Sequence, residues 1–115
     1  MLKVLKNRSE FVNLTKNGDK WVCRSFVVLT TSHNNEDNHP LWGFTASKKI
    51  GNAVKRNRAK RRMRAVAAQF LDHEYAGRKK IVLIARDHVL NQPFETMQKD
   101  LAWAFRKLKE REKAI

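Results

Sequence analysis

The sequence has little of what would cross-link the chain or anchor it in a membrane. It holds one cysteine, Cys23, so it cannot form an intramolecular disulfide, and this fits a reducing compartment. It nowhere approaches about 18 consecutive apolar residues. Its first residues, MLKVLKNRSEF, lack the sustained apolar segment of a signal peptide. We therefore expect a cytoplasmic protein without a membrane anchor.

Acidic residues are also scarce. The chain has 11 Asp and Glu against 25 Lys and Arg, a net charge of +14, and no acid lies between Asp37 and Asp72. Self-repulsion at this charge is destabilising, so we expect an anionic partner, with nucleic acid ahead of an anionic membrane surface. A paired-carboxylate motif and a glycine-rich phosphate loop are also missing, since GNAVKR (residues 51–56) lacks the P-loop pattern. Catalysis by the polypeptide itself is therefore not expected.

The length and composition predict one folded domain over residues 1–115. With 115 residues and an apolar content of 42%, the chain is large enough to bury one core. Residues 1–8 form a basic arm without a clear pattern. Ser9 predicts the N-cap of a short helix over Glu10–Lys16, which ends at Gly18.

Three segments have the composition of strands. Trp21–Thr31 is rich in β-branched and aromatic residues and predicts one strand. Leu41–Ala46 predicts a second, which we expect to pair antiparallel with the first across a polar loop. Lys80–Arg86 contains a continuous apolar run, which is typical of a strand covered on both faces.

Two longer helices complete the predicted order. The first runs from about Ala53 to Tyr75 and ends at Gly77, and the second follows Pro93. Residues 109–115 form a charged tail that we expect to fray. The sequence predicts an α+β fold, a small single-domain two-layer sandwich in the order α-β-β-α-β-α, with room for an extra short strand beside the second. The two helices have these apolar stripes: Ala59, Met63, Val66, Ala67 and Phe70; Phe94, Met97, Leu101, Ala104, Phe105 and Leu108.

The strongest functional signal is the basic run Lys48–Arg64, which holds nine basic residues and no acid. Its apolar residues fall on one stripe of the predicted helix, so most of its cations share the remaining surface. Arginine outnumbers lysine five to two over residues 55–64. Guanidinium groups bind phosphate oxygens bidentately, which favours contact with phosphates over a merely solvated basic face.

The residues of this run also carry a family resemblance. Ser47–Arg64, SKKIGNAVKRNRAKRRMR, resembles the signature of the protein subunit of bacterial ribonuclease P. The RNR tripeptide at residues 56–58 matches that family's Arg-Asn-Arg motif, and the basic positions after it match as well. KNRSEF, SFVVL, GFTASKK and VLIAR resemble the family elsewhere, so the similarity runs over residues 6–108.

The resemblance implies a fold and a function. The family's small α+β sandwich places the motif helix in a left-handed βαβ crossover, whereas such crossovers are generally right-handed. Its protein binds the catalytic RNA subunit of ribonuclease P and helps it remove the 5′ leader from precursor tRNA. The RNA supplies the active site with bound Mg²⁺, and the protein raises substrate and metal affinity. No membrane and no obligate protein partner are implied.

The resemblance and the predicted helix face together indicate the site residues. A cleft between the first helix and the sheet would hold the single-stranded leader, on aromatic side chains where these occur. The candidates for that cleft are Phe11, Phe26, Leu29 and Trp21, although Phe26 is equally compatible with a core position and Trp21 with a core or surface-packing role. Thr15 and Leu29 depart from aromatic residues of the family. The expected RNA contacts are Ser47, Lys48, Lys49, Lys55, Arg56, Asn57, Arg58, Lys60, Arg61, Arg62 and Arg64.

Other signals are weaker. His33 and His39 share a polar loop with Glu36 and Asp37, but no Cys–His ligand motif supports a metal site there. Two alternative functions remain open. A ribosome-associated structural protein would share the charge but lack the leader cleft. A self-sufficient endoribonuclease would need carboxylates to hold its own metal ions, which are not evident.

Overall fold

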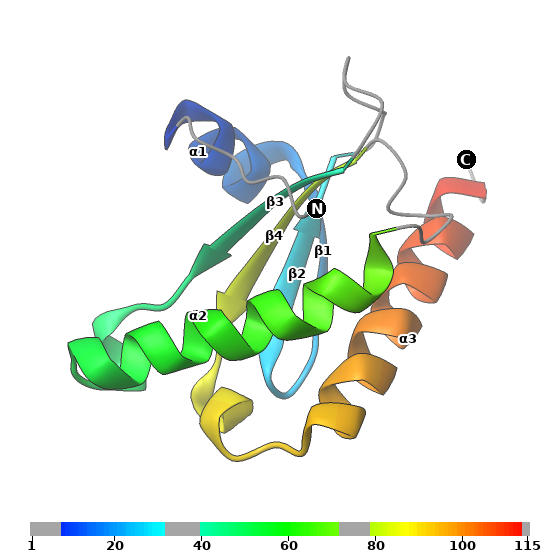
Figure 1. Ribbon diagram of the computed structural model, residues 1–115. Helices are drawn as coiled ribbons and strands as arrows, with labels where there is room; N and C mark the ends of the chain where they lie inside the picture. The colour runs from blue at the N-terminus through cyan, green and yellow to red at the C-terminus, as the bar shows by residue number, and fades with distance from the viewer. Residues whose placement is uncertain (1–7, 32–39, 72–78, 114–115) are drawn as a thin grey trace.

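The computed structural model describes residues 8–31, 40–71 and 79–113. They form a four-stranded sheet in the order β1-β2-β4-β3, with helices on both of its faces (Figure 1). The predicted α+β class is confirmed. The elements are α1 (Arg8–Asn17), β1 (Asp19–Val22), β2 (Phe26–Thr30), β3 (Leu41–Thr45), η1 (Lys48–Ile50), α2 (Ala53–Ala67), η2 (Ala68–Phe70), β4 (Lys80–Ala85), η3 (Asp87–Leu90) and α3 (Phe94–Lys113).

The single strand predicted over Trp21–Thr31 is wrong, because the segment folds into the antiparallel hairpin β1–β2. The turn is made by residues 23–25, and the Cys23 N–H donates to the Phe26 carbonyl at 2.9 Å. This turn contains no Gly, Pro, Asn or Asp, and Ser25 is its one residue of a type favoured in turns, so its sequence signal is weak. The expected extra short strand therefore exists, but as β1 at the far edge of the sheet and not beside β3.

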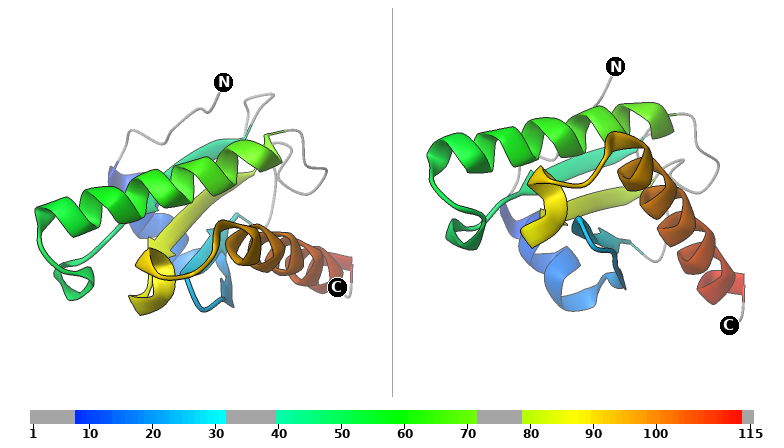
Figure 2. Two further views of the ribbon diagram at one scale, coloured as in Figure 1. Left: turned by 60° about the horizontal axis from the view of Figure 1, so that its bottom comes forward. Right: turned by 90° about the horizontal axis from the view of Figure 1, so that it is seen from below.

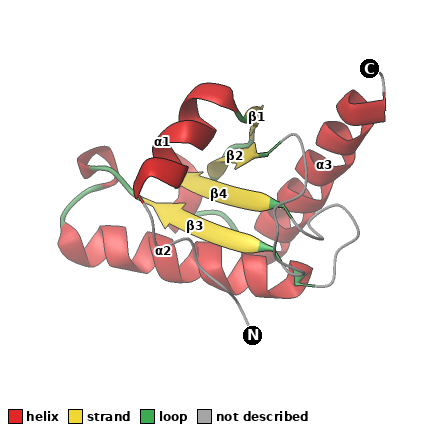
Figure 3. Ribbon diagram, turned by 90° about the horizontal axis from the view of Figure 1, so that it is seen from above, coloured by secondary structure: helices red, strands yellow, loops and turns green. Residues whose placement is uncertain are grey.

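The predicted antiparallel pairing of the second strand with the first is also wrong. Strand β3 pairs in parallel with β4, in the register Trp42↔Ile81 and Phe44↔Leu83, while β2 lies on the other side of β4. Figure 3 shows β3 and β4 pointing the same way beside each other. Parallel neighbours need a long crossover, and α2 supplies it.

The β3–α2–β4 crossover has the uncommon hand. In Figure 1 both strands run toward the lower left, β4 lies to the right of β3, and α2 passes in front of the sheet, which is the left-handed sense. About 98% of such crossovers are right-handed. The hand expected from the family resemblance is therefore confirmed.

The main core lies between the sheet and the helices α2 and α3, which cover one face (Figure 2). Trp42, Phe26 and Phe105 are fully buried there. The other face meets α1, where Leu14 packs on Leu29 and Val82. Strand β4 thus buries side chains on both faces, as its apolar run predicts.

The helix limits agree with the predictions in part. Helix α2 begins at Ala53 as expected, but it narrows to a 3-10 turn at Ala68, and the predicted end at Tyr75–Gly77 lies outside the described residues. Ser9 lies inside α1 and is not its N-cap. Helix α3 continues to Lys113, so the charged tail begins in helical conformation, and its fraying stays a prediction.

Two single residues at helix ends, Gly18 and Phe94, can also be compared with the predictions. Gly18 follows the end of α1, as predicted. The position requires glycine, because a Cβ there would lie 2.7 Å from the Leu14 carbonyl oxygen and 2.8 Å from that of Thr30. Phe94 was predicted to be buried, but it is 37% exposed in the first turn of α3, before the helix reaches the core. The other five members of the predicted α3 stripe are fully buried.

Candidate nucleic-acid interface

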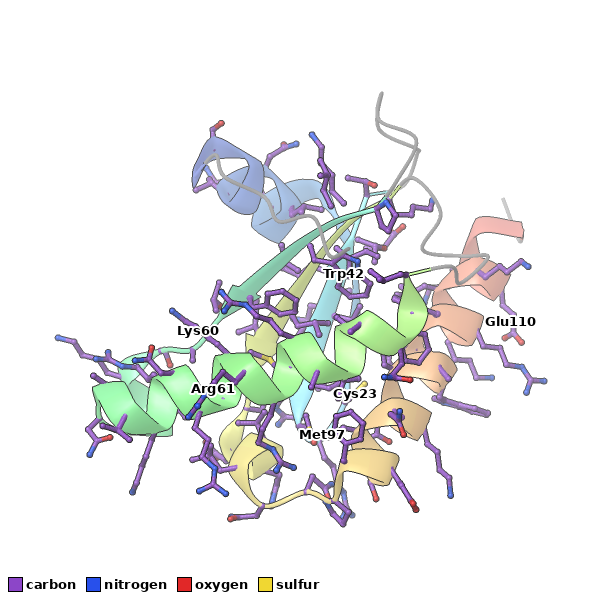
Figure 4. The ribbon with its side chains drawn as sticks, in the orientation of Figure 1. Cys23, Trp42, Lys60, Arg61, Met97 and Glu110 are labelled. Atoms are coloured by element: carbon purple, nitrogen blue, oxygen red, sulfur yellow. The ribbon has the colours of Figure 1, made fainter. Side chains whose placement is uncertain are left out.

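Helix α2 presents its basic side chains to solvent because its apolar stripe fixes its orientation. Ala59, Met63 and Val66 are all 0% exposed against the sheet. Figure 4 shows Arg61 on the outer side of α2 and Trp42 behind the helix, toward the sheet. The exposed members of the predicted set are Lys55, Asn57, Arg58, Arg61 and Arg64, while Arg56 and Lys60 are half-buried.

The start of α2 brings the first part of the motif onto the same surface. Ser47 caps η1 by accepting from the Lys49 N–H at 3.3 Å, and Asn52 caps α2 by accepting from the Lys55 N–H at 3.0 Å. Gly51 joins the two with φ 139°, a conformation that a side chain would strain. Ser47, Lys48 and Lys49 are exposed, as the resemblance implies.

Arg62 is the member of the basic run that does not serve this surface. Its guanidinium NH2 group donates to the Gln92 carbonyl and lies 3.4 Å from the Met97 sulfur, and its Nε is buried. The side chain therefore ties α2 to the start of α3. The position of Arg62 on the helix directs its guanidinium to the α2–α3 junction and away from the exposed basic side chains, so contact of Arg62 with RNA stays a prediction.

Arg64 lies over an aromatic ring. Its Cζ is 5.7 Å from the ring centroid of Phe44, while the side chain remains exposed. Such a cation–π contact is worth about 0.5–1 kcal/mol at an exposed site. Arg64 is therefore held against β3 instead of extending freely into solvent.

The predicted leader-cleft residues do not come together. Phe26 is 0% exposed and Trp21 packs against the same core, so both lie on the α2–α3 face of the sheet and not on the α1 face. Strand alternation explains this, because Trp21 is paired with Val28, another residue of that core. Leu29 faces α1 but is only 3% exposed. Phe11 belongs to α1, and its side chain is outside the described part of the structure.

A row of aliphatic side chains and one threonine remains accessible on the α1 face. Val22, Val27, Ile84 and Thr45 are cross-strand neighbours on the four strands, in that order. Val22 is 50% exposed and the other three are half-buried. We call these four residues the aliphatic row. The alternation of side chains along each strand indicates which residues share a face. Identifying the four as neighbours also required the register between β2 and β4.

A hollow of about 310 Å³ lies beside Ile84 of this row. Because β3 and β4 are parallel, the segments that follow their carboxyl ends meet at the same edge of the sheet. Lys49 and Arg86 thus become neighbours across the hollow, although they are far apart in sequence. Sequence reasoning missed Arg86. The lining residues are Ser47, Lys49, Ile50, Ile84, Ala85, Arg86 and Asp87.

The β1–β2 turn holds Arg86 at this edge. An Arg86 guanidinium nitrogen donates to the Cys23 carbonyl at 2.7 Å, and the Arg86 N–H donates to the Ser25 carbonyl at 2.9 Å. Cys23 lies in the turn and not in the strand predicted over Trp21–Thr31, and its side chain is buried. Burial raises the pKa of its thiol to about 12, and Asp100 adds to the shift. Burial likewise raises the pKa of the Asp100 carboxyl, against the effect of Arg24.

The described residues offer no evident metal site. Within residues 8–31, 40–71 and 79–113, no three His, Cys, Asp or Glu side chains are grouped as ligands. The loop with His33 and His39 lies outside these residues. In the same part of the chain, no helix has the length and apolar character needed to cross a membrane.

Comparison with known proteins identifies the family. The sequence profile of the ribonuclease P family matches residues 2–109. The chain belongs to the ribonuclease P protein family. As a ribonuclease P protein, it is a component of a tRNA-processing ribonucleoprotein endoribonuclease.

Individual ribonuclease P proteins agree with this assignment. The protein component of Bacillus pumilus is 40% identical over 105 residues, which cover 90% of this chain and 85% of that one. The Staphylococcus aureus structure matches with a TM-score of 0.76 at 32% identity, covering 95% of this chain and 97% of that one. The Thermotoga maritima protein matches in fold, with a TM-score of 0.73 at 24% identity over 91% of this chain and 96% of that one.

Proposed function

We propose that this chain is the RNA-binding protein subunit of ribonuclease P and that it attaches to the catalytic RNA subunit through the outer side of α2. The observation that carries the proposal is the exposed basic side of α2, fixed by a buried stripe in a chain of this family. Arginine forks and lysine ammonium groups there match phosphate oxygens. The proposed contacts are Ser47, Lys48, Lys49, Lys55, Arg56, Asn57, Arg58, Lys60, Arg61 and Arg64.

The single-stranded 5′ leader of precursor tRNA would lie on the opposite face of the sheet. The aliphatic row offers apolar contact to bases, and Lys49 and Arg86 at the adjoining hollow offer cations to the phosphates. Without an aromatic ring in the row, base stacking contributes less than the roughly 1–3 kcal/mol per base that aromatic platforms supply.

A negative charge on the aliphatic row tests the leader site. Val22→Asp should weaken the binding of precursor tRNA to the reconstituted enzyme, because Val22 is half exposed and a carboxylate repels the leader. Mature tRNA, which has no leader, should bind the variant as it binds the unaltered enzyme. Equal weakening for both RNAs, or for neither, would argue against this site.

Hydrolysis would belong to the RNA subunit in the cytoplasm. Magnesium held by that RNA supplies the metal-assisted chemistry, and the described residues present no ligand set of their own. The protein's cations would raise substrate and magnesium affinity by offsetting phosphate repulsion in the assembled complex.

Reconstitution at low magnesium tests the proposal. Cleavage of precursor tRNA is measured with the RNA subunit alone, with the protein alone and with both together. We expect little cleavage with either alone and efficient cleavage with both. If the protein leaves cleavage by the RNA unchanged, the proposal fails. If the protein cleaves alone, a self-sufficient nuclease is the better description.

A matched pair of variants ties the effect to α2. Arg61→Gln removes one exposed charge from the proposed surface, whereas Arg106→Gln removes one from α3, where that side chain is paired with Glu110 at 3.6 Å. Arg61→Gln should weaken RNA binding by about 1–3 kcal/mol, the scale of a charge-assisted hydrogen bond. Arg106→Gln should bind nearly as the unaltered protein does. Equal losses would indicate a response to net charge alone.

A further inference from the structure

Arg64 differs from the other exposed arginines of α2 in having an aromatic ring beneath it. The Phe44 ring centroid lies 5.7 Å from the Arg64 Cζ, and Phe44 itself is only 9% exposed. Among the described residues, no aromatic ring lies beneath Arg58 or Arg61. Arg64 therefore has a fixed apolar support that its neighbours on the helix lack.

The supporting ring is itself held in place by the core. Phe44 stacks on Trp42 with 6.3 Å between ring centroids and an angle of 4° between the planes. Trp42 is fully buried and packs in turn on Phe105 at 6.1 Å. Three rings from β3 and α3 thus form a column that leads from the core to the Arg64 guanidinium. Because interiors are close-packed, Phe44 cannot turn away when RNA approaches.

We propose that Phe44 is a positioning residue for RNA binding, which holds the Arg64 guanidinium in place before the RNA arrives. This inference rests on the proposed function. The ring occupies a π face of the guanidinium and leaves the N–H groups at its edge to bind phosphate oxygens. A long side chain normally loses rotamer freedom when it binds, and a side chain that is already ordered loses less. A lysine ammonium can also lie over a ring, as Lys107 does over Trp103 at 4.6 Å, but it has no planar group to stack on the ring and is therefore held less firmly.

A double-mutant cycle between Phe44 and Arg64 tests the proposal. Affinity for the RNA subunit is measured for the unaltered protein, Phe44→Leu, Arg64→Lys and the double variant. We expect the loss caused by Arg64→Lys to be smaller in the Phe44→Leu background, by up to about fivefold, which is the fold-change for complete loss of an exposed cation–π contact. If the two losses simply multiply, Phe44 acts only through the fold, and the proposal is overturned.

Arg61 supplies the matched control, since it is exposed on the same helix without a ring. Arg61→Lys should give the same fold-loss with Phe44 and with Leu at position 44. If Phe44→Leu alters the effects of Arg61→Lys and Arg64→Lys equally, it has disturbed the whole helix, and a specific role for Phe44 is rejected.

Failure of the inference can be separated from failure of the proposed function. If Arg64→Gln binds the RNA subunit as the unaltered protein does, Arg64 is not an RNA contact. Both the positioning role of Phe44 and the proposed contact at Arg64 are then rejected. If Arg64→Gln weakens binding but Arg64→Lys does not, RNA contact stands and positioning by Phe44 falls.

Nuclear magnetic resonance provides a second measurement that needs no substitution at Phe44. In the free protein, the side-chain Nε–H of Arg64 should have a higher order parameter than that of Arg61. Equal mobility of the two side chains would overturn the proposal, even if Phe44→Leu fails to fold.

Discussion

Arg62 shows how one residue of a basic run can serve the fold instead of the ligand. It contacts the Gln92 carbonyl and Met97, whereas Arg61 beside it is exposed. Arg62→Gln should lower the free energy of unfolding by about 1–3 kcal/mol, because a partly buried charge-assisted hydrogen bond is lost. Urea denaturation measures this change. The salt dependence of RNA binding should remain that of the unaltered protein.

Arg61→Gln is the counterpart of that variant on the same helix. It should leave the denaturation midpoint nearly unchanged and reduce the slope of log K against log salt by about 0.7–0.9, the contribution of one phosphate contact. If the two variants behave alike, the division between a fold residue and an RNA residue is wrong.

Cys23 predicts a pH effect at the residue scale. Burial raises its pKa from the usual 9.0 to about 12 in the folded protein. Between these values the unfolded chain loses the thiol proton and the folded chain keeps it, so stability falls as pH rises. Urea midpoints measured between pH 8 and pH 11 should therefore fall more steeply for the unaltered protein than for Cys23→Ala. Parallel curves would contradict the assignment.

At the scale of elements, the start of α2 is unusual because its first turn contains no acidic residue. Acidic side chains normally stabilise this end of a helix, and cations there are unfavourable. Asn52→Asp keeps an N-cap acceptor and adds a negative charge. It should raise the free energy of unfolding by about 0.3–1 kcal/mol in the absence of RNA.

The same Asn52→Asp substitution should weaken binding to the RNA subunit, because the carboxylate lies beside Lys55 on the proposed surface. Stability and affinity thus change in opposite directions. Denaturation and binding assays on one preparation measure both changes. Asn52→Ala is the control, since it removes the cap without adding charge and should cost about 0.5–2 kcal/mol of stability. An unchanged affinity for Asn52→Asp would place the start of α2 outside the interface.

The elements were predictable where the signal is local. The start of α2 follows from Gly51 and Asn52, and the apolar stripe of α2 is buried as its spacing predicts. The β1–β2 turn was not predictable because residues 23–25 carry only Ser25 as a turn signal, inside a segment that otherwise favours a strand. The parallel pairing of β3 with β4 depends on contacts between distant segments, which no local pattern contains.

For the whole molecule, the net charge of +14 predicts strongly salt-dependent binding. If about six cations contact phosphates, log K should fall with log salt at a slope of about −4 to −5. Titration of the RNA subunit with protein at several salt concentrations measures this slope. A slope near zero would remove the electrostatic basis of the proposed interface.

The candidate site was predictable in composition but not in arrangement. The basic run and its helix face follow from sequence, because they depend on spacing within one segment. The direction of the Arg62 side chain depends on Gln92, and the hollow depends on Arg86, both of which reach the site only through the tertiary fold. For the same reason, assignment of Phe26 and Trp21 to a face required the sheet register.

The strand order has a consequence for synthesis of the protein on the ribosome. Strand β4 lies between β2 and β3, so these two strands cannot join in one sheet until residues 80–85 have emerged from the ribosome. Until then, Phe26, Val28 and Trp42 cannot be buried in the completed core. The whole basic run therefore leaves the ribosome before the chain can fold. Folding must await the final third of the sequence, and a chain interrupted before Lys80 should remain unfolded.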